Sequence, residues 1–161
     1  MSDSIETARL QVLRSYGILD TPREPAFDDI VALATQICAV PVGLVSLVAA
    51  DRQWFKARHG FPSCETPLSQ SVCAHALGAA DGLLVIPDLT ADPRTCENTL
   101  VTGPPHIRFY AGAVLRTEDG VSFGTLCVID TEPRPDGLKP DQAFALRALA
   151  QQVMSGRWRS R

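Results

Sequence analysis

The sequence contains no apolar run approaching the ~20 residues that a membrane-spanning helix needs, so we expect no membrane span. It also has no excess of basic residues: its 161 residues include 15 Lys and Arg against 18 Asp and Glu, a formal net charge of −3. This balance argues against a nucleic-acid binder, which needs a basic face toward the phosphates. The polar start, Met1 to Ser4, has no basic segment leading into an apolar one, so we predict no secretory signal and a cytoplasmic protein.

Aromatic residues are few, at 6%, and none of the five cysteines forms a C-x-x-C pair. That absence argues against zinc-ribbon and thioredoxin-type motifs, and we predict no metal site. The odd number of cysteines and the missing export signal predict reduced thiols. Cys38 and Cys127 lie in apolar runs and are predicted to be core residues, whereas Cys64, Cys73 and Cys96 are less clearly core.

The length and the apolar content of 45% predict one domain over residues 1–161. Helical spacing of apolar residues predicts N-terminal helices within 1–39, one ending near Gly17 and one over about 26–39. The same spacing predicts a C-terminal helix over 140–158, with Phe144 among the residues facing the core.

The segment 40–130 is predicted to form the sheet and the cover of a pocket. Short β-branched or alternating runs predict strands over 42–48, 54–58, 83–86, 109–116 and 123–129. Turns at 51–53 and 118–120 make two hairpins, so we expect an α+β fold with a mostly antiparallel central sheet. The terminal helices would cover one face. A short helix over 69–79 and the long polar stretch 90–105 would cover a pocket on the other face.

Several motifs in this order match a known family, and they are Tyr16–Thr21, Phe27–Ile30, Asp51–Lys56, Glu65–Pro67, Ser71–Ala76, Pro87–Asp88, Ile107–Ala113 and Gly124–Asp130. On these residues the chain resembles a GAF domain, the small-molecule-sensing module of bacterial signalling proteins. It is most similar to the subclass found ahead of sensor histidine kinases and diguanylate cyclases. The resemblance covers nearly the whole chain.

The resemblance implies the GAF fold and a non-catalytic regulatory module that binds a small molecule. It also implies a homodimer through the terminal helices and a kinase or cyclase as output partner. It specifies neither the ligand nor a cofactor. In such relatives the last helix continues into an output domain, whereas this sequence stops at Arg161. We therefore expect a sensor that acts on a partner, or an excised part of a longer sensor.

Arg108 and Tyr110 are the first candidate ligand-binding residues. They alternate along a predicted strand and so point to one face. The Arg108 guanidinium is suited to clamp an acidic group of a ligand. The alternative is an ion pair with Asp88 or Asp92 that ties the loop down.

Further candidates lie in the cover and on the first hairpin. Asp88, Asp92 and Asn98 would bind ligand; the alternative for Asp92 and Asn98 is to cap a turn or a short helix. Trp54 would stack on a ligand ring or pack against a terminal helix. Cys73 and His75 are two residues apart on a helix, so they face apart and cannot easily share a metal ion. A helix start can make the Cys73 thiol reactive, and His75 would bond the backbone or a carboxylate.

Two other functions stay open. The free methionine-(R)-sulfoxide reductases, a GAF branch of about this length, use three cysteines in an order similar to Cys64, Cys73 and Cys96. Against a reductase, Tyr110 and Cys127 stand at two of the places where that branch has acidic residues. A bilin-binding photoreceptor is the second alternative, but such relatives have an adjacent Cys-His pair, and Ala74 separates Cys73 from His75 here.

Overall fold

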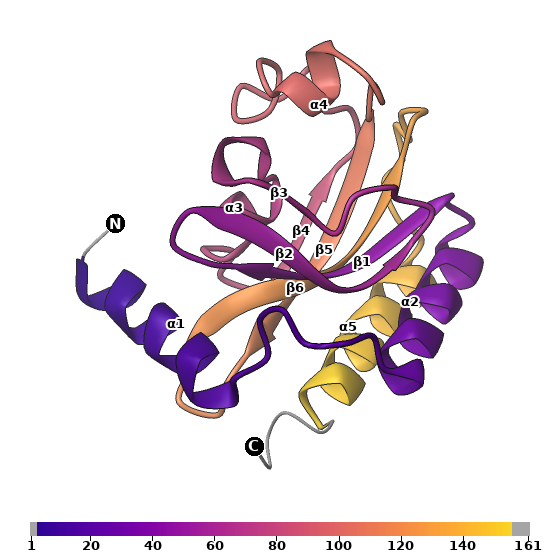
Figure 1. The fold of residues 1–161 in the computed structure, drawn as a ribbon. Helices are drawn as coiled ribbons and strands as arrows, with labels where there is room; N and C mark the ends of the chain where they lie inside the picture. The colour runs from indigo at the N-terminus through magenta and orange to yellow at the C-terminus, as the bar shows by residue number, and fades with distance from the viewer. Residues whose placement is uncertain (1–2, 156–161) are drawn as a thin grey trace.

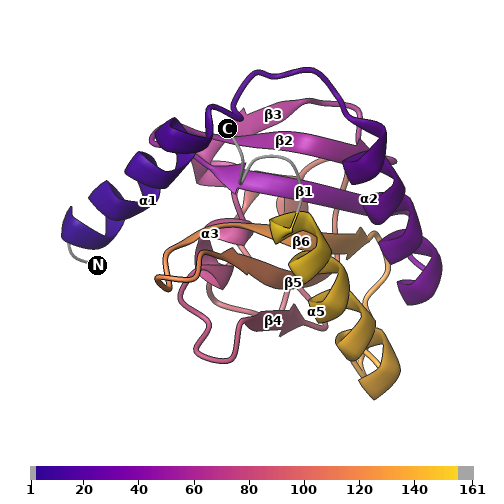
Figure 2. The ribbon, with the colours of Figure 1, turned by 90° about the horizontal axis from the view of Figure 1, so that it is seen from below.

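A six-stranded antiparallel sheet forms the middle layer of the molecule, with helices on one face and a cover of short elements on the other (Figures 1 and 2). The structure is a computed structural model, and it describes residues 3–155. The strands are β1 (Val42–Val48), β2 (Arg52–His59), β3 (Glu65–Pro67), β4 (Leu83–Ile86), β5 (Phe109–Arg116) and β6 (Ser122–Asp130). The helices are α1 (Asp3–Tyr16), α2 (Pro25–Cys38), α3 (Cys73–Ala76), α4 (Thr99–Thr102), α5 (Pro140–Met154) and the 3-10 turn η1 (Leu68–Gln70). The predicted α+β fold with a mostly antiparallel central sheet is confirmed.

The strand order is β3-β2-β1-β6-β5-β4, and every neighbouring pair is antiparallel. The hairpins β1–β2 and β5–β6 lie next to each other, so β1 and β6 are the two central strands. All seven residues of β1 are buried, as expected for a strand that is covered on both faces. Its side chains alternate between two cores, with Val45 and Leu47 toward the helices and Leu44 and Val48 toward the cover.

The helix face contains the larger core. In Figure 2, α2 and α5 lie side by side across the sheet, whereas α1 lies apart from both, toward the other end of the strands. α1 reaches the same core through Leu13, and the Arg9 guanidinium on α1 donates to the carbonyls of Val48 and Ala49 at the end of β1. Proline in the first turn starts both α2 and α5, where its missing N–H costs nothing.

The cover differs from the prediction in three places. The helix expected over 69–79 is instead two short pieces, η1 and α3. Ser71 separates them because its backbone is extended and its side chain bonds Gln53 on β2 and the backbone N–H of Ala74. Strand β3 and helix α4 were not predicted. Elements of three or four residues have too few positions to show a period.

The helical spacing predicted that Phe144 faces the core, but it does not. Its side chain is 74% exposed on α5, whereas Leu146, Ala150 and Val153 are buried. Leu33 and Ile37 on the neighbouring helix α2 are also exposed. The predicted end of the last helix, residues 156–158, lies outside the described residues.

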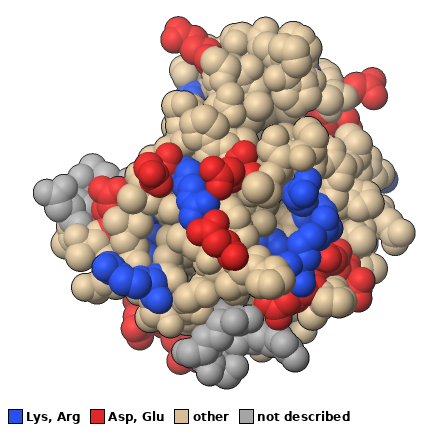
Figure 3. Space-filling view, viewed as in Figure 1, with Lys and Arg blue, Asp and Glu red and all other residues tan. Residues whose placement is uncertain are grey.

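Charges of both signs are mixed on the surface that Figure 3 shows, rather than gathered into one basic patch. Arg52, for example, bonds both Asp20 and Glu65. Within residues 3–155, no helix combines the length and apolar character needed to cross a bilayer.

Candidate functional site

Two thiols and three hydroxyls meet between the sheet and the cover, and we call these five residues the thiol–hydroxyl cluster: Ser46, Cys73, Tyr110, Thr125 and Cys127. All five are buried. The Cys73 sulfur, at the start of α3, lies 3.8 Å from the Cys127 sulfur on β6. The hydroxyls of Thr125 and Tyr110 donate to Cys73 Sγ over 3.1 and 3.2 Å.

Strand register explains why these groups meet. Ser46 pairs with Thr125 across β1 and β6, and Cys127 follows Thr125 by two residues on the same face. Gly112, opposite Cys127 on β5, leaves room for the Tyr110 ring, because a Cβ on this glycine would lie 2.2 Å from the Tyr110 hydroxyl. The ring therefore lies along its own strand, and its hydroxyl reaches Cys73.

The hydrogen bonds favour the thiolate form of Cys73. Burial acts to raise the pKa of Cys73, but hydrogen bonds with Cys127, Thr125 and Tyr110, together with the nearby Ser46 hydroxyl, outweigh it and lower this pKa to about 6. The Ser46 hydroxyl forms no hydrogen bond of standard geometry with the described residues. It is therefore available to donate to a thiolate on Cys73. Cys73 raises the pKa of its neighbour Cys127 well above the usual thiol value, and burial adds to this. The cluster can therefore hold one thiolate beside one thiol.

The space for a ligand under the cover is almost filled. The cavity beside Cys73 and Tyr110 holds only about 10 Å³, with Leu44 and Phe55 on its sheet side and Leu100 and Ile107 among its other walls. A volume of this size is about what one water molecule needs. Of the predicted ligand-binding residues, the structure brings only Cys73 and Tyr110 together here.

Arg108 reaches the cover, but it bonds carbonyl groups rather than a carboxylate. Its Nη1 donates to the backbone oxygens of Val101 on α4 and Ile107. Asp88 accepts hydrogen bonds from Thr90 instead, and these bonds lower the pKa of Asp88. Arg108 thus ties α4 to the start of β5, and no ion pair with Asp88 or Asp92 forms.

The other cover candidates have local partners. Asp92 accepts from the backbone and the guanidinium of Arg94, and Asn98 caps α4 by accepting from the N–H of Leu100. Both match the capping alternative. His75 is exposed while Cys73 is buried, so the two face apart as predicted.

Trp54, Cys64 and Cys96 lie away from the cluster. Trp54 is buried in the core under the helices, on the opposite face of the sheet. Cys64 is exposed beside β2 and the segment 20–23. Cys96 is half-buried in the cover loop, where its sulfur contacts the carbonyl of Pro93. In the part of the chain that the structure describes, all five cysteines are free thiols, and no group of three or more His, Cys, Asp or Glu could hold a metal ion.

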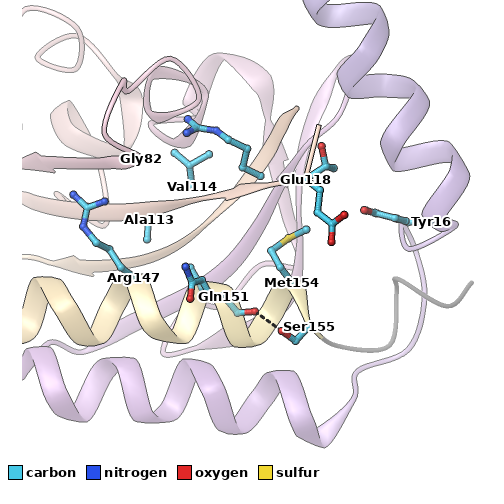
Figure 4. A pocket seen from close by; sticks show the side chains of 12 residues that line it. Tyr16, Gly82, Ala113, Val114, Glu118, Arg147, Gln151, Met154 and Ser155 are labelled. Atoms are coloured by element: carbon cyan, nitrogen blue, oxygen red, sulfur yellow. Dashed lines mark hydrogen bonds between the residues drawn. The ribbon is translucent and has the colours of Figure 1, made fainter. Parts of the chain in front are cut away.

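An open hollow of about 450 Å³ lies between α5, strand β5 and Gly82, the residue just before β4. Binding sites for small molecules commonly have such volumes. Figure 4 shows Arg147 and Met154 directed from α5 toward the strands. We call this space the α5 hollow, and its lining also includes Gly82, Ala113, Val114, Arg116, Thr117, Ala150 and Gln151.

Two guanidinium groups converge at one end of the α5 hollow. The Nη1 atoms of Arg116 and Arg147 lie 4.0 and 3.8 Å from the position that a Cβ on Gly82 would take. The two Nη1 atoms are therefore at most about 8 Å apart. Arg116 bonds Ser122 and the carbonyl of Ala79 through its other nitrogens. Arg147 bonds the carbonyl of Asp81, whose exposed carboxylate lies 3.4 Å from Nη2.

Sequence reasoning missed Thr125, Ser46, Arg116 and Arg147 as site residues and assigned Cys127 only to the core. A hairpin symmetric about the turn at 118–120 would place Gly112 opposite Leu126. A register shift between Leu115 and Arg116 instead brings Gly112 opposite Cys127, so the turn alone does not reveal this contact. Nothing in the sequence signals the α5 hollow, because it depends on how far α5 lies from the sheet edge.

A family model described as "GAF domain" matches residues 22–155. A cyclic di-GMP phosphodiesterase of Pseudomonas aeruginosa is 39% identical over 150 residues, which are 93% of this chain and 25% of that protein. The chain thus spans about a quarter of this curated relative's length.

Solved structures share the fold at low sequence identity. The GAF domain of an Acinetobacter phosphoenolpyruvate-protein phosphotransferase has a TM-score of 0.61 and 14% identity, over 96% of this chain and 93% of that one. The free methionine-R-sulfoxide reductase of Neisseria meningitidis has a TM-score of 0.62 and 18% identity, over 96% and 90%. The chromophore-binding domain of an R. palustris bacteriophytochrome has a TM-score of 0.57 and 16% identity, over 94% and 59%. At these identities the likeness concerns the fold alone.

Proposed function

This chain belongs to the GAF domain family, and on that premise we propose that it is a non-catalytic, small-molecule-binding regulatory module of bacterial signal transduction that works in the cytoplasm. The similarity to a quarter of a cyclic di-GMP phosphodiesterase supports a role beside an output enzyme. Its output partner would be a kinase, a cyclase or an enzyme of cyclic di-GMP turnover. Occupancy of the ligand site would act on this partner through the terminal helices.

The α5 hollow is the ligand site in this proposal. The supporting observation is the contrast in volume between the hollow, at about 450 Å³, and the space under the cover, at about 10 Å³. A ligand in the hollow would contact α5 and the sheet edge together. It could therefore shift α5, the helix that leads toward an output domain in similar sensors.

The charges of the α5 hollow favour an anionic ligand. A phosphate or carboxylate can accept one hydrogen bond of about 2.8 Å from each of two guanidiniums. The Nη1 atoms of Arg116 and Arg147 are at most about 8 Å apart, which is within the reach of one such anion. Asp81 is the competing anion, but its side chain is mostly exposed and is readily displaced into water. The apolar wall formed by Ala113, Val114 and Ala150 would hold the uncharged part of the ligand.

Titration calorimetry with three probes tests this proposal: inorganic phosphate, succinate and guanosine monophosphate. We expect saturable binding of at least one probe, and at least about tenfold weaker binding by the Arg147→Gln and Arg116→Gln variants. Arg94→Gln is the matched control, because Arg94 also pairs with a nearby aspartate but lies in the cover loop. Equal binding by all four proteins, or none of the probes binding, would remove the α5 hollow as the ligand site.

The reductase alternative is tested separately, by incubating the reduced protein with free methionine sulfoxide and a thioredoxin system. We expect no turnover, because Cys64 is exposed beside β2 while Cys73 is enclosed under the cover. Turnover that is abolished by Cys96→Ser would contradict the non-catalytic proposal.

A further inference from the structure

We propose that Cys73 and Cys127 form an oxidisable dithiol, a site that a small peroxide converts to an intramolecular disulfide. The observation that carries this proposal is the contact of the two sulfurs at 3.8 Å, inside the core and away from the α5 hollow. It does not depend on the proposed ligand, so either proposal can fail alone.

The geometry needs only a small movement to close the bond. A disulfide bond is about 2.05 Å long, so the two sulfurs must approach by less than about 2 Å. Cys127 lies on the central strand β6, which is held by neighbours on both sides. Cys73 is the first residue of α3, a helix of four residues joined to the sheet by the short segment 68–72. The movement therefore falls on α3.

The hydroxyls of the cluster prepare Cys73 as the nucleophile. The hydroxyls of Thr125 and Tyr110 both donate to Cys73 Sγ, and the Cys127 sulfur lies 3.8 Å from it. Donation to a sulfur stabilises its thiolate, the form that attacks peroxides. The raised pKa of Cys127, due first to its hydrogen bond with Cys73, keeps that residue a thiol that can supply a proton.

The size of the neighbouring space selects the oxidant. The cavity lined by Cys73 and Tyr110 has room for about one water molecule, at about 10 Å³. Hydrogen peroxide has only one more oxygen atom than water, so a slight opening of the cover admits it, whereas a sulfoxide of amino-acid size needs the cover to unfold. The cover consists of elements of three or four residues, which open locally at low cost.

Oxidation of the two thiols by hydrogen peroxide takes two steps. In the first, the Cys73 thiolate attacks one oxygen of hydrogen peroxide. The S–O bond forms, the O–O bond breaks, and the leaving hydroxide takes a proton to become water. In the second, the Cys127 sulfur attacks Cys73 Sγ. The S–S bond forms, the S–O bond breaks, and the hydroxide leaves as water with the Cys127 proton. Two thiols lose two electrons, and one peroxide becomes two waters.

The disulfide would change the cover in two ways. It would join α3 covalently to β6, and it would remove the thiolate to which Thr125 and Tyr110 donate. A dithiol reductant would reverse both changes by exchange. The cover would thus report the redox state of its surroundings.

The test uses a Cys64→Ser/Cys96→Ser variant, which keeps three of the five cysteines and removes the more accessible thiols. The reduced protein is treated with hydrogen peroxide, alkylated in denaturant and mapped by mass spectrometry. We expect the alkylated thiols to fall from three to one, with the Cys73 and Cys127 peptides linked and the mass lower by two hydrogens. The Cys127→Ser variant should instead accumulate a dimedone-reactive sulfenic acid on Cys73.

The wild-type protein is mapped in the same way, so the result does not depend on a variant that fails to fold. Linkage at the same rate in urea would overturn the proposal, because the folded structure would then not be responsible for it. Unlinked Cys73 and Cys127 after exposed thiols have oxidised would also overturn it.

Discussion

At the scale of single residues, the unusual feature is a buried sulfur that receives hydrogen bonds from several side chains. Thiols donate and accept weakly, and a buried free cysteine is normally a small apolar residue. Cys73 instead lies among donors on three strands: Ser46, Tyr110 and Thr125. Such an arrangement stabilises a negative charge that burial alone would expel. The sulfur is therefore the place where pH should act on the fold.

Between about pH 6 and the usual thiol pKa of about 8.5, Cys73 should make stability rise with pH. In this window the folded protein holds a thiolate while the unfolded chain binds a proton, so raising the pH favours the folded state. The stabilisation is complete above about 8.5 and is lost as the pH falls through about 6. Urea unfolding of the reduced protein at several pH values should show a slope of roughly 1 kcal/mol per pH unit that Cys73→Ser removes.

Cys38→Ser is the control for this measurement, because burial raises the pKa of Cys38 and the thiol stays protonated in that window. Its difference from the wild type should not change with pH between 6 and 8. Parallel curves for the wild type and Cys73→Ser would show that Cys73 is not a thiolate in the folded state.

Sequence reasoning at this scale identified Cys73 and Tyr110 but not the contact between them. Alternation along a strand tells which residues share a face, and Arg108 and Tyr110 do both point toward the cover. This alternation does not reveal which residue of a distant segment a side chain will contact. Cys73 reaches Tyr110 only because Ser71 breaks the helix before α3 and fixes the cover to Gln53.

At the scale of elements, the long helices and most strands could be predicted, since each repeats its apolar period several times. The failures are the short elements β3, η1, α3 and α4, which are fixed by tertiary contacts rather than by propensity. Asn98 shows the limit: it was recognised as a possible cap, yet the helix that it caps has only four residues.

Helix α1 is attached to the sheet in part by the side chain of Arg9. The largely buried Arg9 guanidinium donates to the Val48 and Ala49 carbonyls and pairs with Glu6. In Arg9→Gln these carbonyls lose their charged donor, a change that typically costs about 1–3 kcal/mol. We expect α1 amides to exchange at least about tenfold faster in hydrogen-exchange mass spectrometry, while β5 and β6 keep their protection.

Arg14→Gln is the matched control, because Arg14 is exposed on the same helix. Its α1 amides should exchange as in the wild type. Equal exchange in the two variants would show that apolar packing, through Leu13, holds α1 without help from Arg9.

At the scale of the whole molecule, the layers follow from the sequence because each strand had to be covered on one or two faces. Strand β1, whose side chains are apolar except for Ser46, required covers on both faces, and the structure has them. Which helix residues face outward could not be predicted in the same way. Periodicity placed Phe144 inside, whereas its ring is exposed on α5.

Apolar side chains on the α2–α5 layer are exposed together. Leu33 and Ile37, one turn apart on α2, are 47% and 41% exposed, and Phe144 on α5 is 74% exposed. The Gln142 amide bonds the carbonyl of Ile37, which brings the start of α5 to the end of α2. Exposed apolar surface of this kind favours association. The predicted homodimer through terminal helices would bury it.

We therefore expect the wild-type chain to be a dimer by light scattering coupled to size-exclusion chromatography, and Phe144→Asp to be a monomer. A buried aromatic anchor typically contributes about 2 kcal/mol or more to an interface, and a carboxylate there would also be desolvated. Thr102→Asp, an exposed change on α4 in the cover, should leave the dimer intact. If Phe144→Asp stays dimeric with normal stability, the dimer uses another surface, and α1, with its exposed Ile5, becomes the next surface to mutate.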